Sequence, residues 1–258
     1  MSPTGAVCPT CDLVYVDEPP GNDELARAYH VANYDSSDEA DDAARAYIRA
    51  ARLTLSKLPR REAALEIGTG TGIFLEHLSR AGFTKLMGVE PSAAAIAAAP
   101  EHRRAWIRAA MFDEREFAPE SFDLICCFMT MEHVHDPDAV ARSALRLLRP
   151  GGAFVVVTHN YRSLVNRILG KSSPIIDIEH MQLFSRRSVR NLLEASGYSG
   201  ITVKAFLNTY SLRYWTRLMP LPRGVKQALL RLMTAVGVDQ AKLGLNVGNL
   251  ISAGFKNA

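Results

Sequence analysis

Three glycines at alternate positions could bring backbone N–H groups close to a bound ligand. Gly68, Gly70 and Gly72 follow an apolar run that predicts a buried strand, and residues 73–81 after them have the apolar period of a helix. Glycine reaches positive φ at little cost and has no Cβ, and the start of a helix attracts negative charge. The spacing therefore predicts a ligand-binding turn between a strand and a helix.

An acidic residue after the next expected strand indicates which ligand this turn binds. Residues 85–89 predict a short strand that ends at Glu90, roughly twenty residues after the glycines, where a carboxylate can accept hydrogen bonds from both hydroxyls of a ribose. The dinucleotide fingerprint is G-x-G-x-x-G, whereas this chain has G-x-G-x-G preceded by Glu66. We expect a nucleoside site, and the spacing argues against a nicotinamide-dependent oxidoreductase.

Strand and helix patterns alternate through the centre of the chain, which predicts an α/β fold with a mostly parallel sheet. Four motifs occur in order: Glu-Ile-Gly-Thr-Gly-Thr-Gly at 66–72, Ser-Phe-Asp-Leu-Ile at 121–125, Met-Glu-His-Val-His-Asp-Pro at 131–137 and Leu-Leu-Arg-Pro-Gly-Gly at 147–152. In order and spacing they resemble the class I S-adenosylmethionine-dependent methyltransferases. This resemblance implies a Rossmann-like, seven-stranded sheet with helices on both faces, with S-adenosylmethionine as cofactor and S-adenosylhomocysteine as product.

The same resemblance implies a set of cofactor contacts. The glycine loop would wrap the methionine part, Glu90 would hold the ribose, and an aromatic from the N-terminal region would close over the cofactor. The implied residues are Tyr34, Glu66, Gly68, Thr69, Gly70, Gly72, Glu90, Pro91, Met111, Phe112, Asp113, Phe128 and Thr130. The family often has Gly-Asp after the third strand, where this chain has 109–113 as Ala-Ala-Met-Phe-Asp. We therefore expect Met111 and Phe112 to flank the adenine, with Asp113 available to its amine.

Histidines at expected strand ends are candidates for proton removal from an acceptor. An unperturbed imidazole has a pKa of about 6.5 and can act as a base near neutral pH. His133 and His135 follow the fourth expected strand, His159 follows the fifth, and His180 lies further along the chain. From the resemblance we favour His180 as the base or orienting group and His133 as second choice, while proximity alone could also suffice.

The composition is that of an ordinary globular protein of one α/β domain with additions. There is no apolar run long enough to cross a bilayer and no signal-peptide pattern, so we expect a cytoplasmic protein. Residues 1–160 carry 16 Lys/Arg and 23 Asp/Glu, whereas residues 161–258 carry 14 and 4. This basic half suits an anionic or carrier-bound acceptor or a membrane surface, or is a solvated face.

Three regions are expected. Residues 1–58 form an extended leader and helices, at 23–30 and 38–55, that close over the cofactor; residues 59–160 form the cofactor-binding core; and residues 161–258 complete the sheet, with an edge strand at 249–255, and add an acceptor lid. Cys126 and Cys127 lie in an apolar run and predict core packing. Cys8 and Cys11 resemble one knuckle of an N-terminal zinc ribbon, but a structural zinc needs four ligands, so we expect no metal unless a dimer shares it.

The last segment predicts two helices, at 211–219 and 225–236, separated by Pro220-Leu-Pro. The second has one apolar face flanked by basic residues. We favour packing of that face on the domain as a helical acceptor lid, with a peripheral membrane contact as the alternative.

The leading hypothesis is a methyltransferase for a small-molecule hydroxyl, in a sugar, natural product or quinone precursor. Carbon or nitrogen acceptors and a non-catalytic cofactor-binding partner protein stay open. Nucleic acid is not expected, because the amino-methylase signature and a platform of stacking aromatics are missing from the sequence. The protein could be a monomer or a homodimer.

Overall fold

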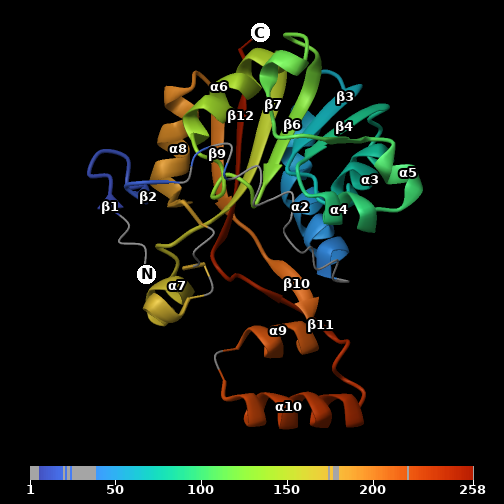
Figure 1. Ribbon diagram of the computed structural model, residues 1–258, viewed down its shortest axis with the longest axis vertical. Helices are drawn as coiled ribbons and strands as arrows, with labels where there is room; N and C mark the ends of the chain where they lie inside the picture. Colours follow the sequence, from blue (N-terminus) through green and yellow to red (C-terminus); the bar gives the residue numbers. More distant parts are fainter. Residues whose placement is uncertain are drawn as a thin grey trace.

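A seven-stranded sheet forms the centre of the computed structural model, which describes residues 6–19, 21, 24, 39–173, 175–176, 180–219 and 221–257 (Figure 1). The strands are β1 (Ala6–Val7), β2 (Val14–Tyr15), β3 (Ala63–Ile67), β4 (Lys85–Glu90), β5 (Ile107–Ala109), β6 (Phe122–Phe128), β7 (Leu148–His159), β8 (Gln182–Leu183), β9 (Ser199–Ala205), β10 (Asn208–Ser211), β11 (Lys242–Leu245) and β12 (Asn249–Phe255). The helices are α2 (Glu39–Lys57), α3 (Ile73–Arg80), α4 (Ala93–Ala98), α5 (Glu101–Arg104), α6 (Pro137–Leu147), α7 (Leu164–Leu169), α8 (Arg186–Ala195), α9 (Leu212–Leu218) and α10 (Arg223–Ala235).

The sheet is mostly parallel, with strand order β5-β4-β3-β6-β7-β12-β9. Strands β5, β4, β3, β6 and β7 pair in parallel, and β12 is antiparallel to both of its neighbours. This confirms the Rossmann-like fold. The prediction of an edge strand at 249–255 is wrong: β12 pairs with β7 from Asn249–His159 to Phe255–Ala153 and with β9 on its other side, which buries its apolar residues.

Helices cover both faces of the sheet (Figure 1). Apolar side chains of α2 and α3 pack on one face and those of α6 and α8 on the other, in two separate hydrophobic clusters. Successive residues of a strand point to opposite faces, so Cys126 joins the α2 and α3 cluster and Cys127 the α6 and α8 cluster. Both thiols are buried, as the sequence predicts.

The N-terminal residues form a small sheet instead of the expected extended leader. β1 and β2 make a hairpin that adds β8 as a third strand. The hairpin is fixed by Asp12, whose carboxylate accepts hydrogen bonds from Tyr161 Oη (2.8 Å) and Arg162 Nε (2.7 Å). The physical reason is that the hydrogen-bonding groups of this hairpin find partners more than a hundred residues further along the chain. The local sequence carries no sign of those partners.

Cys8 and Cys11 lie in the turn of this hairpin, where the Cys11 N–H donates to Cys8 Sγ at 3.5 Å. Among the residues that the structure describes, no group of three or more His, Cys, Asp or Glu side chains could hold a metal. The helix expected at 23–30 and Tyr34 fall outside the described residues, apart from Glu24.

Residues 208–245, which we call the C-terminal arm, leave the sheet between β9 and β12. β10 and β11 form an antiparallel hairpin, and α9 and α10 extend beyond it, at the lower end of Figure 1. The arm is attached to α2 through a Lys242–Asp42 ion pair and an Arg49–Thr209 hydrogen bond of 3.3 Å. The two helices occur where predicted, but the expectation that the apolar face of α10 packs on the domain is wrong. Val225, Ala228, Leu232 and Val236 on that face are exposed, and α10 packs on α9 of the same arm.

Candidate functional site

A pocket of about 540 Å³ opens at the carboxyl ends of β3, β4 and β6. Its wall is drawn from α2, the glycine loop, the ends of β4 and β6 and the segments that follow them. The lining residues are Ala40, Ala43, Ala44, Tyr47, Glu66, Ile67, Gly68, Thr69, Gly70, Ile73, Phe74, Val89, Glu90, Pro91, Ser92, Met111, Phe112, Phe128, Met129, Thr130, His133 and Val134. Most of the residues implied by the resemblance are therefore brought together here.

The glycine loop needs residues without a Cβ. Gly68, Gly70 and Gly72 have φ of +74°, +56° and +69°, in the left-handed region that side chains disfavour. A Cβ on Gly68 would lie 2.3 Å from Thr130 Oγ1. The backbone at Gly68 therefore passes directly beside the residue that follows β6.

Glu90 links β4 to this loop. Its Oε2 accepts the Gly70 N–H at 2.7 Å and its Oε1 accepts the Ser92 N–H at 2.8 Å. Burial raises the pKa of the Glu90 carboxyl, and the two backbone hydrogen bonds offset only part of that increase. Each carboxylate oxygen has two acceptor positions, so both can still receive a ligand hydroxyl.

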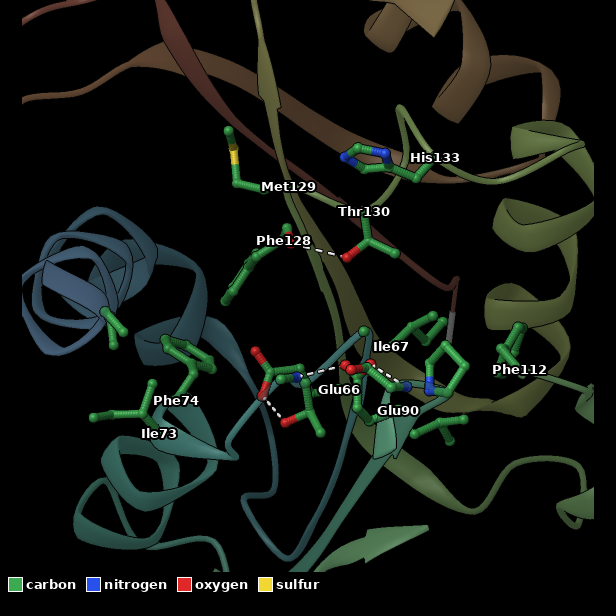
Figure 2. A pocket seen from close by; sticks show the side chains of 18 of the residues that line it. Glu66, Ile67, Ile73, Phe74, Glu90, Phe112, Phe128, Met129, Thr130 and His133 are labelled. Carbon is green, nitrogen blue, oxygen red and sulfur yellow. Dashed lines mark hydrogen bonds between the residues drawn. The ribbon is translucent and has the colours of Figure 1, made fainter. Parts of the chain in front are cut away.

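Glu66 is a second buried carboxyl on the pocket floor. Figure 2 shows it beside Glu90. Thr69 Oγ1 donates a hydrogen bond to Glu66 Oε2 at 2.5 Å. The pKa of Glu66 is raised to about 8, because burial and, to a smaller extent, the charge of Glu90 outweigh the lowering effect of the Thr69 hydrogen bond. A floor with two carboxyl groups favours a ligand that carries positive charge nearby.

Met111 and Phe112 line the side of the pocket expected to hold adenine. Phe112 stacks on Phe117, with centroids 6.3 Å apart. The described pocket wall does not include Gly72 or Asp113, contrary to expectation. A Cβ on Gly72 would face Ile107, and the Asp113 carboxylate instead accepts hydrogen bonds from Arg115 as it caps the turn of Glu114–Glu116.

Three histidines meet beside the end of the pocket marked by His133. The ring centroids of His133 and His180 are 4.7 Å apart, and those of His159 and His180 are 5.4 Å apart. His180 Nδ1 lies 2.9 Å from the carbonyl oxygen of Ile175. Because a carbonyl only accepts, Nδ1 carries the proton and the neutral ring has its lone pair on Nε2. The structure thus places both predicted catalytic histidines in contact.

Glu132, which sequence reasoning did not select, supports this group of histidines. Its side chain is fully buried, Oε1 accepts the backbone N–H of His159 at 2.7 Å, and His159 Nδ1 lies 3.3 Å from the same oxygen without hydrogen-bond alignment. Burial raises the pKa of Glu132, but the backbone N–H of His159 and the nearby His159 ring outweigh burial, and the net pKa is lowered. The sequence did contain a signal that could have identified Glu132, because it is an acidic residue that follows an expected buried strand and directly precedes His133.

The family model described as "Methyltransferase domain" matches residues 26–203. The chain belongs to this family. The resemblance of the sequence motifs to class I S-adenosylmethionine-dependent methyltransferases is thereby confirmed, as is the enzyme class. The fold, the glycine loop and the pocket at the strand ends all agree with a methyltransferase.

Curated relatives of this methyltransferase include two ubiquinone biosynthesis O-methyltransferases. The protein of Pseudomonas fluorescens is 32% identical over 117 residues, which cover 41% of this chain and 49% of the relative. That of Aliivibrio fischeri is 27% identical over 165 residues, or 57% of this chain and 70% of the relative. The match thus spans only about half the length of the first relative.

Solved structures agree on the fold. An S-adenosylmethionine-dependent methyltransferase of Thermotoga maritima superposes with a TM-score of 0.55 at 19% identity, covering 91% of this chain and 95% of that one. The likeness extends over nearly the whole methyltransferase chain, the C-terminal half included.

Proposed function

We propose that this methyltransferase transfers the methyl group of S-adenosylmethionine to a phenolic hydroxyl of a small aromatic acceptor related to quinone precursors. The names of the curated relatives support this acceptor class. The observation that carries the proposal is the contact between His180, oriented by the Ile175 carbonyl, and His133 on the pocket wall. This arrangement puts a proton acceptor beside the pocket.

The residues of the pocket fit the cofactor. S-adenosylmethionine supplies an electrophilic methyl group on a cationic sulfonium, together with an ammonium group. Glu66 and Glu90 supply the buried negative charge that such a cation needs, and the glycine loop leaves room beside them. Phe74 and Phe128, whose ring centroids lie 4.6 Å apart in an edge-to-face contact, line the pocket with apolar surface.

On the acceptor side, the chain must remove a proton. A phenol has a pKa of about 10, so its neutral form is a poor nucleophile near neutral pH. His180 can take the proton at Nε2 while Nδ1 stays bonded to Ile175. Glu132 fixes the backbone of His159, whose ring packs against that of His180.

The test follows labelled methyl transfer from S-adenosylmethionine to a catechol and to the matching aniline. We expect O-methylation by the native protein. Replacing His180 with glutamine should lower kcat about 100-fold or more, with cofactor affinity unchanged, because a general base contributes about 10²- to 10⁴-fold. The fall of kcat toward acid pH should also disappear in this variant.

The matched control is His135→Gln, since His135 lies two residues after His133, is exposed and does not line the pocket. It should retain the native kcat. If the native protein methylates only the aniline, the proposal of a hydroxyl acceptor is wrong. A His180→Gln variant with native kcat and pH profile would show that proximity suffices without a base.

A further inference from the structure

The outer face of α10 is apolar and exposed. Within this helix, all of which is described, no side chain is buried. Val225 is 53% exposed, Leu232 61%, and Val236 at the helix end 61%. Their spacing places them on one stripe, about a sixth of a turn from the side on which Leu229 and Met233 are half-buried. An unpartnered apolar stripe of this kind indicates a surface that something else covers.

The charge around this stripe is strongly positive. The C-terminal arm contains six Lys/Arg and a single acid, Asp239, and residues 195–238 contain no Asp or Glu. Asp239 lies 3.7 Å from Arg213. In the part of the chain that the structure describes, no ion pair involves Arg217, Arg223 or Arg231, all of which are exposed. The arm therefore offers uncompensated positive charge next to exposed apolar side chains.

A second exposed apolar site lies at the same edge of the molecule. On α7, Leu164 is 72% and Ile168 74% exposed, with Arg167 exposed between them. α7 follows the carboxyl end of β7, and the arm leaves and rejoins the sheet at the end of β9 and the start of β12, which pairs with that same end of β7. Figure 1 shows α7 level with β10 and α10 further out along the arm, both below the strands of the central sheet. One surface could therefore contact both helices.

We propose that α10, assisted by α7, docks the protein on an anionic lipid surface, lying in the plane of the headgroups with Val225, Leu232 and Val236 inserted. Amphipathic helices with basic residues bind such interfaces through buried apolar area plus attraction to anionic lipids. A second copy of the chain is a poorer occupant, because two arms of the same charge would repel each other across a two-fold contact. None of the described helices is long and apolar enough to cross a bilayer, so contact at the interface is the mode that fits.

Docking at this edge has a consequence for the reaction. The pocket opens at the carboxyl ends of β3, β4 and β6, the edge from which α7 and the arm also emerge. A docked protein would hold its pocket close to the bilayer, within reach of an acceptor that partitions into lipid. This consequence rests on the proposed function, whereas lipid docking itself does not.

The experiment measures flotation of the full chain with vesicles of phosphatidylcholine alone and of phosphatidylcholine mixed with phosphatidylglycerol. We expect binding to the mixed vesicles that weakens when salt rises from about 0.1 M to about 1 M, because the Debye length shortens. Leu232→Glu should weaken binding at least about tenfold, since a charge replaces an inserted side chain. Arg223→Gln combined with Arg231→Gln should weaken it by about 25-fold, at roughly fivefold per charge.

Matched controls come from α2, which lies outside the proposed surface. Leu53 is as exposed as Leu232, and Arg52 is also exposed, so Leu53→Glu and Arg52→Gln should bind vesicles like the native protein. All variants should keep native cofactor affinity, because none of the changed residues lines the pocket. That measurement separates lost docking from lost folding.

Equal binding of native protein to both vesicle types, or native binding by Leu232→Glu, would overturn the proposal. A second contradicting result would be a native protein that is dimeric and does not float with vesicles, and whose dimer is dissociated by Leu232→Glu. The stripe would then be a subunit interface. If the protein binds vesicles but methylates no phenol, the docking proposal stands and the proposed acceptor is wrong. The two proposals can therefore fail separately.

Discussion

Replacing Gly68 with alanine is expected to weaken binding of S-adenosylmethionine by at least about tenfold, which corresponds to about 1.4 kcal/mol. The left-handed conformation at φ +74° costs an alanine about 1–2 kcal/mol, and its Cβ would meet Thr130 Oγ1 at 2.3 Å and Cγ2 at 2.8 Å. Relief of this contact requires the loop to move, or the Thr130 side chain to rotate and give up the hydrogen bond of its Oγ1 to the Phe128 carbonyl oxygen. Calorimetric titration of the variant measures the loss directly.

Gly82→Ala is the matched control. Gly82 also has positive φ, +100°, but among the described residues no atom lies within 4 Å of the position that a Cβ would take, and Gly82 follows α3 away from the pocket wall. This variant should lose stability and keep cofactor affinity. Adding Thr130→Ala to Gly68→Ala removes both of the closest atoms and should restore part of the affinity. Equal affinity losses at Gly68 and Gly82 would contradict the steric account.

Replacing Glu66 with glutamine should remove the pH dependence of cofactor binding. With its pKa near 8, Glu66 is mostly protonated at neutral pH in the empty pocket, and a bound cation requires the carboxylate. Native affinity should therefore rise by about tenfold per pH unit between about pH 6 and about pH 7.5, with release of a proton on binding. Glu66→Gln should bind more weakly, with no such slope.

S-adenosylhomocysteine separates two versions of this prediction. It keeps the ammonium group and lacks the sulfonium charge, so an equal pH slope for both ligands would place the ammonium near Glu66. A slope for S-adenosylmethionine alone would instead place the sulfonium there. No slope for either ligand in the native protein would show that Glu66 does not contact the cofactor's positive charge.

Glu66→Gln should weaken cofactor binding but raise the stability of the folded protein near pH 8. The folded-state pKa of Glu66 lies above its unfolded value of about 4.3, so the folded state binds the proton more tightly. This contribution is fully present below about pH 4.3 and is lost as the pH rises toward 8, by about 1.4 kcal/mol per pKa unit. Glu66→Gln cannot ionise, and its Oε1 can still accept from Thr69, so its Tm at about pH 8 should exceed the native Tm.

The gathering of the glycine loop and Glu90 in one pocket was predictable because its determinants are local. The positions of Gly68 and Glu90 after two adjacent apolar runs specify the strand ends at which they lie, and parallel strands bring those ends together. Asp113 shows the limit of this reasoning. Its carboxylate accepts hydrogen bonds from the neighbouring Arg115, and the sequence motif does not indicate whether Arg115 or a bound ligand will be its partner.

The features that sequence reasoning missed depend on distant pairing. The insertion of β12 between β7 and β9 follows from strand pairing across long chain separations, and the amphipathic pattern of α10 does not say what its apolar stripe faces. Glu132 was hidden for the same reason. Its importance comes from His159, which lies 27 residues further along the chain and is brought beside it by the pairing of β7 with β6.

The most direct test of the central claim is calorimetric titration of the purified chain with S-adenosylmethionine, S-adenosylhomocysteine and NAD. The geometry of the glycine loop and of Glu66 and Glu90 predicts micromolar binding of the first two ligands and no binding of NAD. Binding of NAD without either of the other ligands would contradict the assignment of the pocket.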